Sequence, residues 1–452
     1  MRSEPAPDAS TRTALLITAA LLIAFSAAFF LYYGLNTMNN PVFGIDFVPY
    51  HLAGRLLATG DLEPLTNYAE TGGFFASSGP FLDYFHRYFF PDSSSATRWV
   101  YLPAYVWIFR PLAGMDFPAA ARVWLAVNAL LCLTGVGLLA TARRLPEKKG
   151  YLATWRFAWF VFLGLTFQPT LSNLMHGQVT GLIFLFFCLS WWLLHRQRQF
   201  CAGLALGMIV PFKFYPALFV LYFLWRRQWR VVAGAVVASA LIAVVSLLTV
   251  GWQANLKYFG IVVSELRQGG MAAYNNQSIL GFLLHAFTNH DISTWQDMAD
   301  PSWLMVVRAG LTLSLVAVAV WTMRRPPKAT AQPALAQDLD LALVVFIMLL
   351  ASPITWYHYY MWLLMPLFVL FDAFLLSPEG QTRRMPSRSR VIGLAVAYGL
   401  IVVEGIVVLR PLAAQALNDI WLLRVLLSQS FFGAVLLMLL ALGLRRRLSV
   451  RM

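Results

Sequence analysis

The chain has 452 residues, of which 59% are hydrophobic and only 12% charged, and its mean hydropathy is +0.65. This balance excludes an ordinary water-soluble domain and predicts an all-α polytopic membrane protein. The net charge of +14 does not indicate a nucleic-acid-binding protein. The basic residues stand in short clusters between apolar runs, as they do in the cytoplasmic loops of membrane proteins.

Apolar runs long enough to cross a bilayer recur along the whole chain, and we expect about ten transmembrane helices. Residues 1–13 are predicted to form a cytoplasmic N-terminus and 445–452 a basic cytoplasmic tail, with one membrane domain, 14–444, between them. The predicted spans are 14–33, 119–141, 155–171, 177–195, 230–250, 306–323, 339–351, 358–376, 390–409 and 424–444.

The first span is followed by a long, aromatic external segment, 34–118. It contains partly apolar stretches too interrupted to cross a membrane, such as 99–115. We expect these stretches to lie along the membrane surface as amphipathic helices. A second external loop is predicted at 251–305.

The apolar stretch 200–225 has basic residues at both ends, so a single crossing would leave one basic cluster outside. Two prolines interrupt it, in the sequence PFKFYP at 211–216. The pattern favours a re-entrant hairpin of two short helices, with Lys213 near its tip, and a single kinked span is the alternative. An ammonium group at this depth suits a phosphate ligand, unless the side chain extends to the membrane surface.

Uncommon polar residues map to one side of the membrane on this topology. They are Asp46 and the segments NLMHGQVT (173–180), AYNNQS (273–278) and SPITWYHYY (352–360). Because four segments that are distant in sequence share one face, we predict a single external site built from them.

Each candidate residue also has a structural interpretation. Asp46 is interpreted as a general base, and the alternative is a loop carboxylate that caps nearby amides. His358 fits a ligand-binding role or an aromatic belt, and His176 and Gln178 fit a binding site or a helix cap. Asn276 begins an N-x-S pattern, which makes glycosylation the nominal alternative.

The sequence contains no nucleotide-binding loop and no zinc-type cluster of ligands, and we predict neither a metal nor a cofactor. An acid, a cation, a histidine and amides without a nucleotide cradle suit a lipid-phosphate donor that already resides in the bilayer.

Short motifs spread over most of the chain resemble glycosyltransferase family 87, a family first described as a domain of unknown function within the GT-C superfamily. The motifs are D-F-x-x-Y-H-x-A-G from 46 with G-D-L-x-P-L at 60–65, Y-L-P-A at 101–104 with R-P-L at 110–112, H-G-Q-V-T at 176–180, K-F-Y-P at 213–216, N-N-Q-S at 275–278 and S-P-I-T-W-Y-H-Y-Y at 352–360.

The resemblance implies a GT-C-type bundle that uses a polyprenyl-phosphate-linked sugar. It implies that Asp46 is the catalytic base and that Lys213 and His358 contact the donor phosphate. Two departures from the family pattern are Thr180, where many members have Asn, and Tyr359, where some have a second His. The residues expected to line the substrate cavity are Tyr50, His51, His176, Gln178, Asn276, Gln277, Trp356 and Tyr357.

The predicted reaction is an inverting transfer of a hexose, with mannose favoured, to a lipid or glycan acceptor. The expected location is the bacterial cytoplasmic membrane, with the active site facing the exterior and membrane lipid around it. Two alternatives stay open. One is a transporter or flippase for a glycolipid, which would carry polar residues at mid-depth. The other is an acyltransferase that uses His51 near Asp46.

Overall fold

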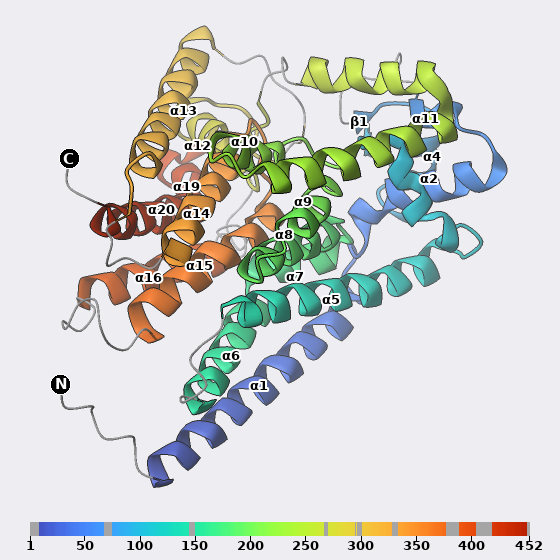
Figure 1. The fold of residues 1–452 in the computed structure, drawn as a ribbon. Helices are drawn as coiled ribbons and strands as arrows, with labels where there is room; N and C mark the ends of the chain where they lie inside the picture. Colours follow the sequence, from blue (N-terminus) through green and yellow to red (C-terminus); the bar gives the residue numbers. More distant parts are fainter. Residues whose placement is uncertain are drawn as a thin grey trace.

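The computed structural model describes residues 9–66, 75–143, 150–265, 270–293, 295, 301–327, 333–376, 388–403 and 418–449. These residues are mostly helical, which confirms the predicted all-α membrane class (Figure 1). Six helices within the described ranges are long and apolar enough to cross a membrane, and two shorter apolar helices accompany them. A small antiparallel sheet, β1 (Phe75–Ala76) with β2 (Ala96–Thr97), was not predicted.

Every predicted span contains a helix. Helix α1 lies along α6, α5 along α8, and α16 along α20 (Figure 1). The helices are α1 (Ala9–Thr37), α5 (Phe117–Ala142), α6 (Gly150–Leu165), α8 (Thr180–His195), α11 (Trp229–Glu265), α13 (Ser302–Met323), α14 (Pro333–Ala351), α15 (Leu364–Phe371), α16 (Arg388–Val402) and α20 (Gln429–Leu448).

Two predicted spans are wrong because each of them is divided between two helices. The span 155–171 is broken: α6 ends at Leu165 and a separate helix, α7 (Gln168–His176), follows. Pro169 has no N–H to bond to a carbonyl one turn earlier, so the first helix cannot continue through it. The span 424–444 is interrupted before Gln429 and divides into α19 (Trp421–Leu426) and α20.

Three further differences concern helix type and length. The stretch 99–115 forms two 3₁₀ helices, η2 (Pro103–Ile108) and η3 (Arg110–Leu112), and not a longer amphipathic helix. Each has a proline in its first turn. The span predicted from 358 opens as a 3₁₀ helix, η5 (Tyr357–Leu363). The predicted loop from 251 starts as a continuation of α11.

Helix α11 bends at Gly251, whose φ of 79° is outside the helical region. The two limbs of the helix lie at a sharp angle to each other (Figure 1). The first limb packs on η2, where Ser246 Oγ accepts a hydrogen bond from the N–H of Ala104 at 3.2 Å. The second limb carries the exposed side chains of Trp252 and Phe259. Short helix α12 (Ile279–Phe287) precedes α13.

The segment between α1 and α5 folds into short elements around a core of aromatic rings. Phe47 stacks on Trp124 with ring centroids 5.8 Å apart, and Tyr50 stacks on Phe109 at 5.1 Å. This packing anchors the start of the segment to α5. The elements are η1 (Ile45–Phe47), α2 (Val48–Thr59), α3 (Glu63–Thr66) and α4 (Pro80–Tyr88).

The stretch predicted as a hairpin forms two short helices, α9 (Gln199–Gly207) and α10 (Ala217–Trp225). A Cβ atom at Gly203 would collide with the carbonyl of Val231, and one at Gly207 with the carbonyl of Ala235. The absence of side chains therefore lets α9 lie directly against α11, as small residues do in membrane helix pairs.

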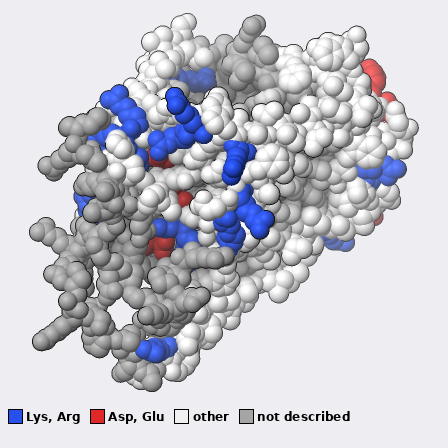
Figure 2. Space-filling view, viewed as in Figure 1, with Lys and Arg blue, Asp and Glu red and all other residues white. Residues whose placement is uncertain are grey.

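Both ends of this pair of helices are held by neighbouring carboxylates of α14. His195, just before the pair, contacts Asp338 at 2.9 Å, and Arg226, just after it, contacts Asp340 at 3.3 Å. Arg445 of α20 also bonds to Asp340, at 2.7 Å, and both side chains are fully buried. Figure 2 shows basic side chains gathered around a few acidic atoms on the left of the molecule. The helical pair therefore starts and finishes at one end of the bundle.

Candidate functional site

Two tight turns bring Asp46 next to Gln178. Gly44, with φ of 74°, precedes η1, and Gly177, with φ of 72°, ends α7. Both glycines adopt the left-handed conformation that side chains disfavour. The N–H of Gly44 donates to the carbonyl of Met175 at 2.9 Å, which joins the two turns. Asp46, two residues after Gly44, and Gln178, the residue after Gly177, are therefore next to each other.

The close approach at Gly177 yields a test of this arrangement. A Cβ atom there would lie 2.8 Å from Cβ of Phe47 and 3.2 Å from Cα of Gly44. We expect Gly177→Ala to separate the two turns. It should lower the kcat of the sugar transfer expected from the sequence at least about tenfold, because small displacements of reacting groups slow a reaction strongly. Gly60→Ala is the matched control, because Gly60 also has positive φ but open space at its Cβ position. Equal loss in both variants would contradict the arrangement.

A chain of hydrogen bonds runs through this contact. Gln178 Nε2 donates to Asp46 Oδ2 at 2.9 Å, and Tyr50 Oη donates to Gln178 Oε1 at 3.0 Å. The hydroxyl groups of Tyr50 and Tyr101 are 2.9 Å apart. Burial raises the pKa of both tyrosines, so they stay neutral and retain their protons for hydrogen bonding. Asp46 itself is partly buried.

Lys213 lies at the tip of the α9–α10 pair, enclosed by aromatic rings. Its Nζ atom is 3.6 Å from the ring centroid of Tyr359, 5.7 Å from that of Tyr101 and 5.9 Å from that of Tyr215. The Nζ atom is buried and has no hydrogen-bond partner. Ring faces stabilise a cation but do not accept all three of its protons, so the ammonium group retains free donors.

His358 lies close to this cation. Its Nε2 atom is buried without a hydrogen-bond partner, and its ring is 6.4 Å from the ring of His176. The ring of Tyr359, whose face contacts the Lys213 ammonium group, is 4.6 Å from the ring of His358. The hydrogen-bond chain from Asp46 ends at Tyr101, whose ring centroid is 5.7 Å from Lys213 Nζ. The structure thus gathers Asp46, Gln178, Lys213, His358 and His176 from separate segments into one site.

Two other predicted site residues, His51 and Tyr357, use their polar atoms in hydrogen bonds within the protein. His51 Nδ1 contacts Tyr84 Oη at 2.8 Å and Nε2 contacts the carbonyl of Leu112 at 3.1 Å. The Tyr357 hydroxyl donates to the carbonyl of Ile401 at 2.6 Å. Their hydrogen bonds lead to Tyr84, Leu112 and Ile401 and not to the hydrogen-bond chain of Asp46.

The predicted residues Asn276 and Gln277 join loops. Asn276 Nδ2 donates to the carbonyl of Met271 at 3.0 Å, and its Oδ1 accepts from the N–H of Thr355 at 3.0 Å. Gln277 Nε2 donates to the carbonyl of Leu427 at 2.8 Å. Asn276 also forms a backbone bridge with Trp356, so these residues support the loop that leads into η5.

Two tyrosines were not predicted as site residues. Tyr101 links Tyr50 to the surroundings of Lys213, and Tyr359 provides the ring nearest to the ammonium group. Both stand inside motifs of the family resemblance, Y-L-P-A and Y-H-Y-Y, and Tyr359 is also one of the two departures from the family pattern. The available signal was their position in those motifs, since an isolated tyrosine in an aromatic-rich chain is not distinctive.

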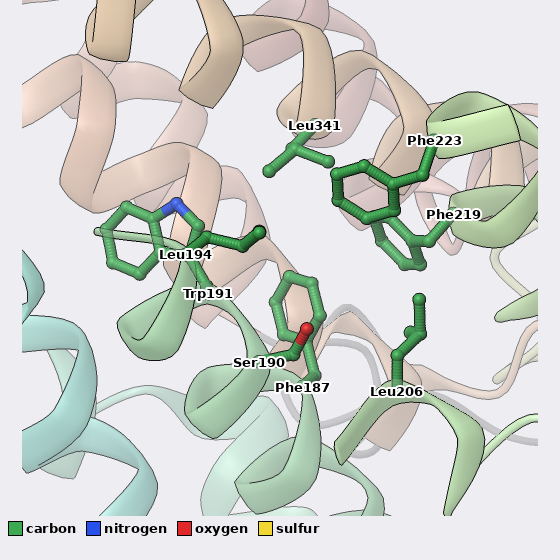
Figure 3. A pocket seen from close by; sticks show the side chains of 8 residues that line it. All are labelled: Phe187, Ser190, Trp191, Leu194, Leu206, Phe219, Phe223 and Leu341. Carbon is green, nitrogen blue, oxygen red and sulfur yellow. The ribbon is translucent and has the colours of Figure 1, made fainter. Parts of the chain in front are cut away.

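A small apolar cavity of about 10 Å³ lies between α8, α9, α10 and α14 (Figure 3). Ser190 contributes the single hydroxyl among its labelled side chains. Trp362 packs on Phe187, which lines the cavity, with ring centroids 4.5 Å apart, and on Tyr215, two residues after Lys213, at 6.0 Å. Trp362 therefore separates the cavity from the surroundings of the cation.

The site contains a carboxylate, that of Asp46, which a hydrogen bond from Gln178 orients. It also contains the buried ammonium group of Lys213 and the imidazole nitrogen of His358, which has no hydrogen-bond partner. A carboxylate of this kind can accept a proton from a hydroxyl group. The ammonium group and the imidazole nitrogen, both buried and without hydrogen-bond partners, can bind an anion. Within the described residues, no cluster of His, Cys, Asp or Glu is suited to hold a metal ion.

Comparison with known proteins found a match between residues 99–353, more than half of the chain, and Glycosyltransferase family 87. This match contains Gln178 and Lys213 but neither Asp46 nor His358. No solved structure matched.

Three curated proteins are similar. One is the polyprenol-phosphate-mannose-dependent alpha-(1-2)-phosphatidylinositol mannoside mannosyltransferase of Mycobacterium tuberculosis, 28% identical over 60% of this chain and 61% of its own length. Its namesake in Mycolicibacterium smegmatis is 25% identical over 74% and 71%, respectively. An alpha-(1->3)-arabinofuranosyltransferase of M. tuberculosis is 24% identical over 50% and 48%.

Proposed function

This chain belongs to glycosyltransferase family 87, and we propose that it transfers mannose from a polyprenyl-phosphate donor to a glycolipid or glycan acceptor. The observation that carries the proposal is the convergence of Asp46, Lys213 and His358 on one group of aromatic rings. The hydrogen-bond chain of Asp46 ends at Tyr101, whose ring borders Lys213, and the ring of Tyr359 borders both Lys213 and His358. A base and an anion-binding group are the two requirements of sugar transfer from a lipid phosphate. The relatives named for polyprenol-phosphate-mannose support the choice of donor.

In the proposed mechanism, Asp46 removes the proton from an acceptor hydroxyl group. The oxygen then attacks the anomeric carbon of the donor and forms the new glycosidic bond, while the bond from that carbon to the phosphate oxygen breaks. A single displacement inverts the configuration at that carbon, and one carboxylate without an enzymic nucleophile suits this outcome. The proton remains on Asp46 until it is released to water.

Lys213 and His358 are proposed to hold the donor phosphate. The ammonium protons that the aromatic rings leave free, together with the open Nε2 position of His358, would meet the phosphate oxygens. Negative charge grows on those oxygens as the sugar departs, so these contacts strengthen in the transition state. Lys213 thus steadies the leaving group, and the reaction needs no metal in this scheme.

The remaining residues are proposed to shape the substrate cavity around this centre. Their contacts with the protein set the positions of the loops that the sugar and acceptor meet. They are Tyr50, His51, His176, Gln178, Asn276, Gln277, Trp356 and Tyr357.

We place the site at the external face of a bacterial cytoplasmic membrane. The basic clusters at the opposite end of the molecule, near Asp338 and Asp340, support this orientation through the preference of basic residues for the cytoplasm. The donor lipid would then lie in the outer leaflet of this membrane. The glycosylated acceptor would be used in the synthesis of cell-envelope glycans.

The proposal is tested with purified protein and three lipid-linked donors that carry mannose, glucose or arabinose. We expect consumption of the mannosyl-phospholipid and release of the lipid phosphate only when an acceptor is present. Consumption of the arabinosyl donor alone would show that the transferred sugar is arabinose and not mannose. Movement of an intact donor across a vesicle membrane, without cleavage, would show that the protein is a flippase and not a transferase.

A further inference from the structure

The side-chain amide of Gln178 is engaged on both of its polar atoms by the protein. Its Nε2 donates to Asp46 Oδ2 at 2.9 Å and its Oε1 accepts from Tyr50 at 3.0 Å. A flipped amide would direct its oxygen at the carboxylate and its N–H at the tyrosine, which the acceptor-only carboxylate disfavours. The carboxylate therefore selects the amide orientation, and the Tyr50 hydroxyl, which can donate, fits it.

The turn that carries Gln178 is clamped from α5. Trp124 Nε1 donates to the carbonyl of Gly177 at 2.9 Å, and Asn128 Nδ2 donates to the carbonyl of Gln178 at 2.7 Å. Both donors are buried. Two side-chain donors on adjacent carbonyls leave the backbone at Gln178 little freedom to move.

A second asparagine supports the first. Asn173 Nδ2 donates to Asn128 Oδ1 at 3.1 Å, and the carbonyl of Asn173 accepts from the N–H of Gln178 at 3.1 Å. Gly181 packs directly on the Asn128 side chain, where any side chain at position 181 would collide with it. Buried amides in an apolar helical bundle are costly unless they are hydrogen-bonded, and here the side chain of Asn128 and the carbonyl of Asn173 both bond to this turn.

We propose that Gln178 is a positioning residue that orients the carboxylate of Asp46, and that Asn128 and Asn173 hold Gln178 in place. With Oδ2 bonded to Gln178, the other carboxylate oxygen is directed to the acceptor hydroxyl. This inference rests on the proposed function and assigns to Gln178 a role toward the base in place of a contact with the sugar.

The proposal predicts a distinctive pH dependence for Gln178→Glu. When protonated, the introduced carboxyl donates to Asp46 as the amide does, and when ionised it repels Asp46. The charged and titratable groups around this position are Asp46, Tyr50, Tyr101, His176, Lys213, His358 and Tyr359, and two of these, Asp46 and Tyr50, contact it directly. The tyrosines stay neutral in the range tested.

The experiment measures kcat and donor KM of the purified full-length protein with a polyprenyl-phosphate-mannose donor between about pH 5 and pH 8. For Gln178→Glu we expect kcat to approach wild type at the acid end and to be about 10- to 100-fold lower at the alkaline end. Gln168→Glu, the same change at the start of α7, is the matched control and should follow the wild-type profile.

Gln178→Ala supplies a second readout that does not depend on pH. We expect kcat to fall about 10- to 100-fold with donor KM changed less than about threefold, because the base and not the phosphate site is disturbed. A loss that appears in KM, or a Gln178→Glu profile identical to wild type, would overturn the positioning role. Absence of mannose transfer by the wild-type protein would instead refute the proposed function.

Discussion

Asp46→Asn is expected to lower mannose transfer about 10²- to 10⁴-fold, the range that general base catalysis contributes. The substitution keeps the size of the side chain and one carbonyl oxygen, which still accepts the bond from Gln178 Nε2. It removes the capacity to take a proton. The measurement is the initial rate of sugar transfer at saturating donor and acceptor, with the amount of folded protein matched by size-exclusion chromatography.

Asp83→Asn serves as the control, because Asp83 is an exposed carboxylate on α4 of the same segment. It should transfer sugar at the wild-type rate. If Asp46→Asn also retained near-normal turnover, then another group would be the base, and the mechanism proposed above would fail at its first step.

Lys213→Met is expected to raise the KM for the donor about 10- to 150-fold. The estimate follows from a loss of about 1.5–3 kcal/mol for a hydrogen bond to a charged group, at tenfold per 1.4 kcal/mol. Methionine retains much of the apolar chain that packs among Tyr101, Tyr215 and Tyr359, so folding should be preserved. Direct binding of the donor to the purified variant separates this effect from a change in turnover.

Lys257→Met is the control, since Lys257 is exposed on the second limb of α11. It tests whether the loss of any positive charge weakens capture of an anionic lipid. An unchanged donor affinity in Lys213→Met, or an equal loss in both variants, would contradict the assignment of Lys213 to the phosphate.

The helices were predictable because hydropathy is a local property of the chain. Each span is a continuous apolar run, and the two prolines around Lys213 mark the turn between α9 and α10. The break at Pro169 was equally visible in the sequence, but the apolar run on both sides of it suggested one helix. Its consequence is large, because the separate helix α7 delivers Gln178 to the site.

Hydrogen-bond partners were not predictable, since Asp46 and Gln178 are 132 positions apart. Proximity along the chain was also misleading for the two neighbours of Asp46. Tyr50 follows it by four residues and reaches the site, whereas His51 points to Tyr84 on the other side of α2. One residue on a helix rotates a side chain by about 100°, which is enough to separate these two directions.

The anchoring of α9 and α10 has a consequence for how a donor is captured. Asp338 and Asp340 hold the residues before the start of α9 and after the end of α10. The glycine contacts with α11 fix α9 along its length. Only the non-helical tip, 208–216, is left to adapt its shape. We therefore expect any change of shape on binding the proposed lipid donor to be confined to the nine residues 208–216, while α9 and α10 keep their positions.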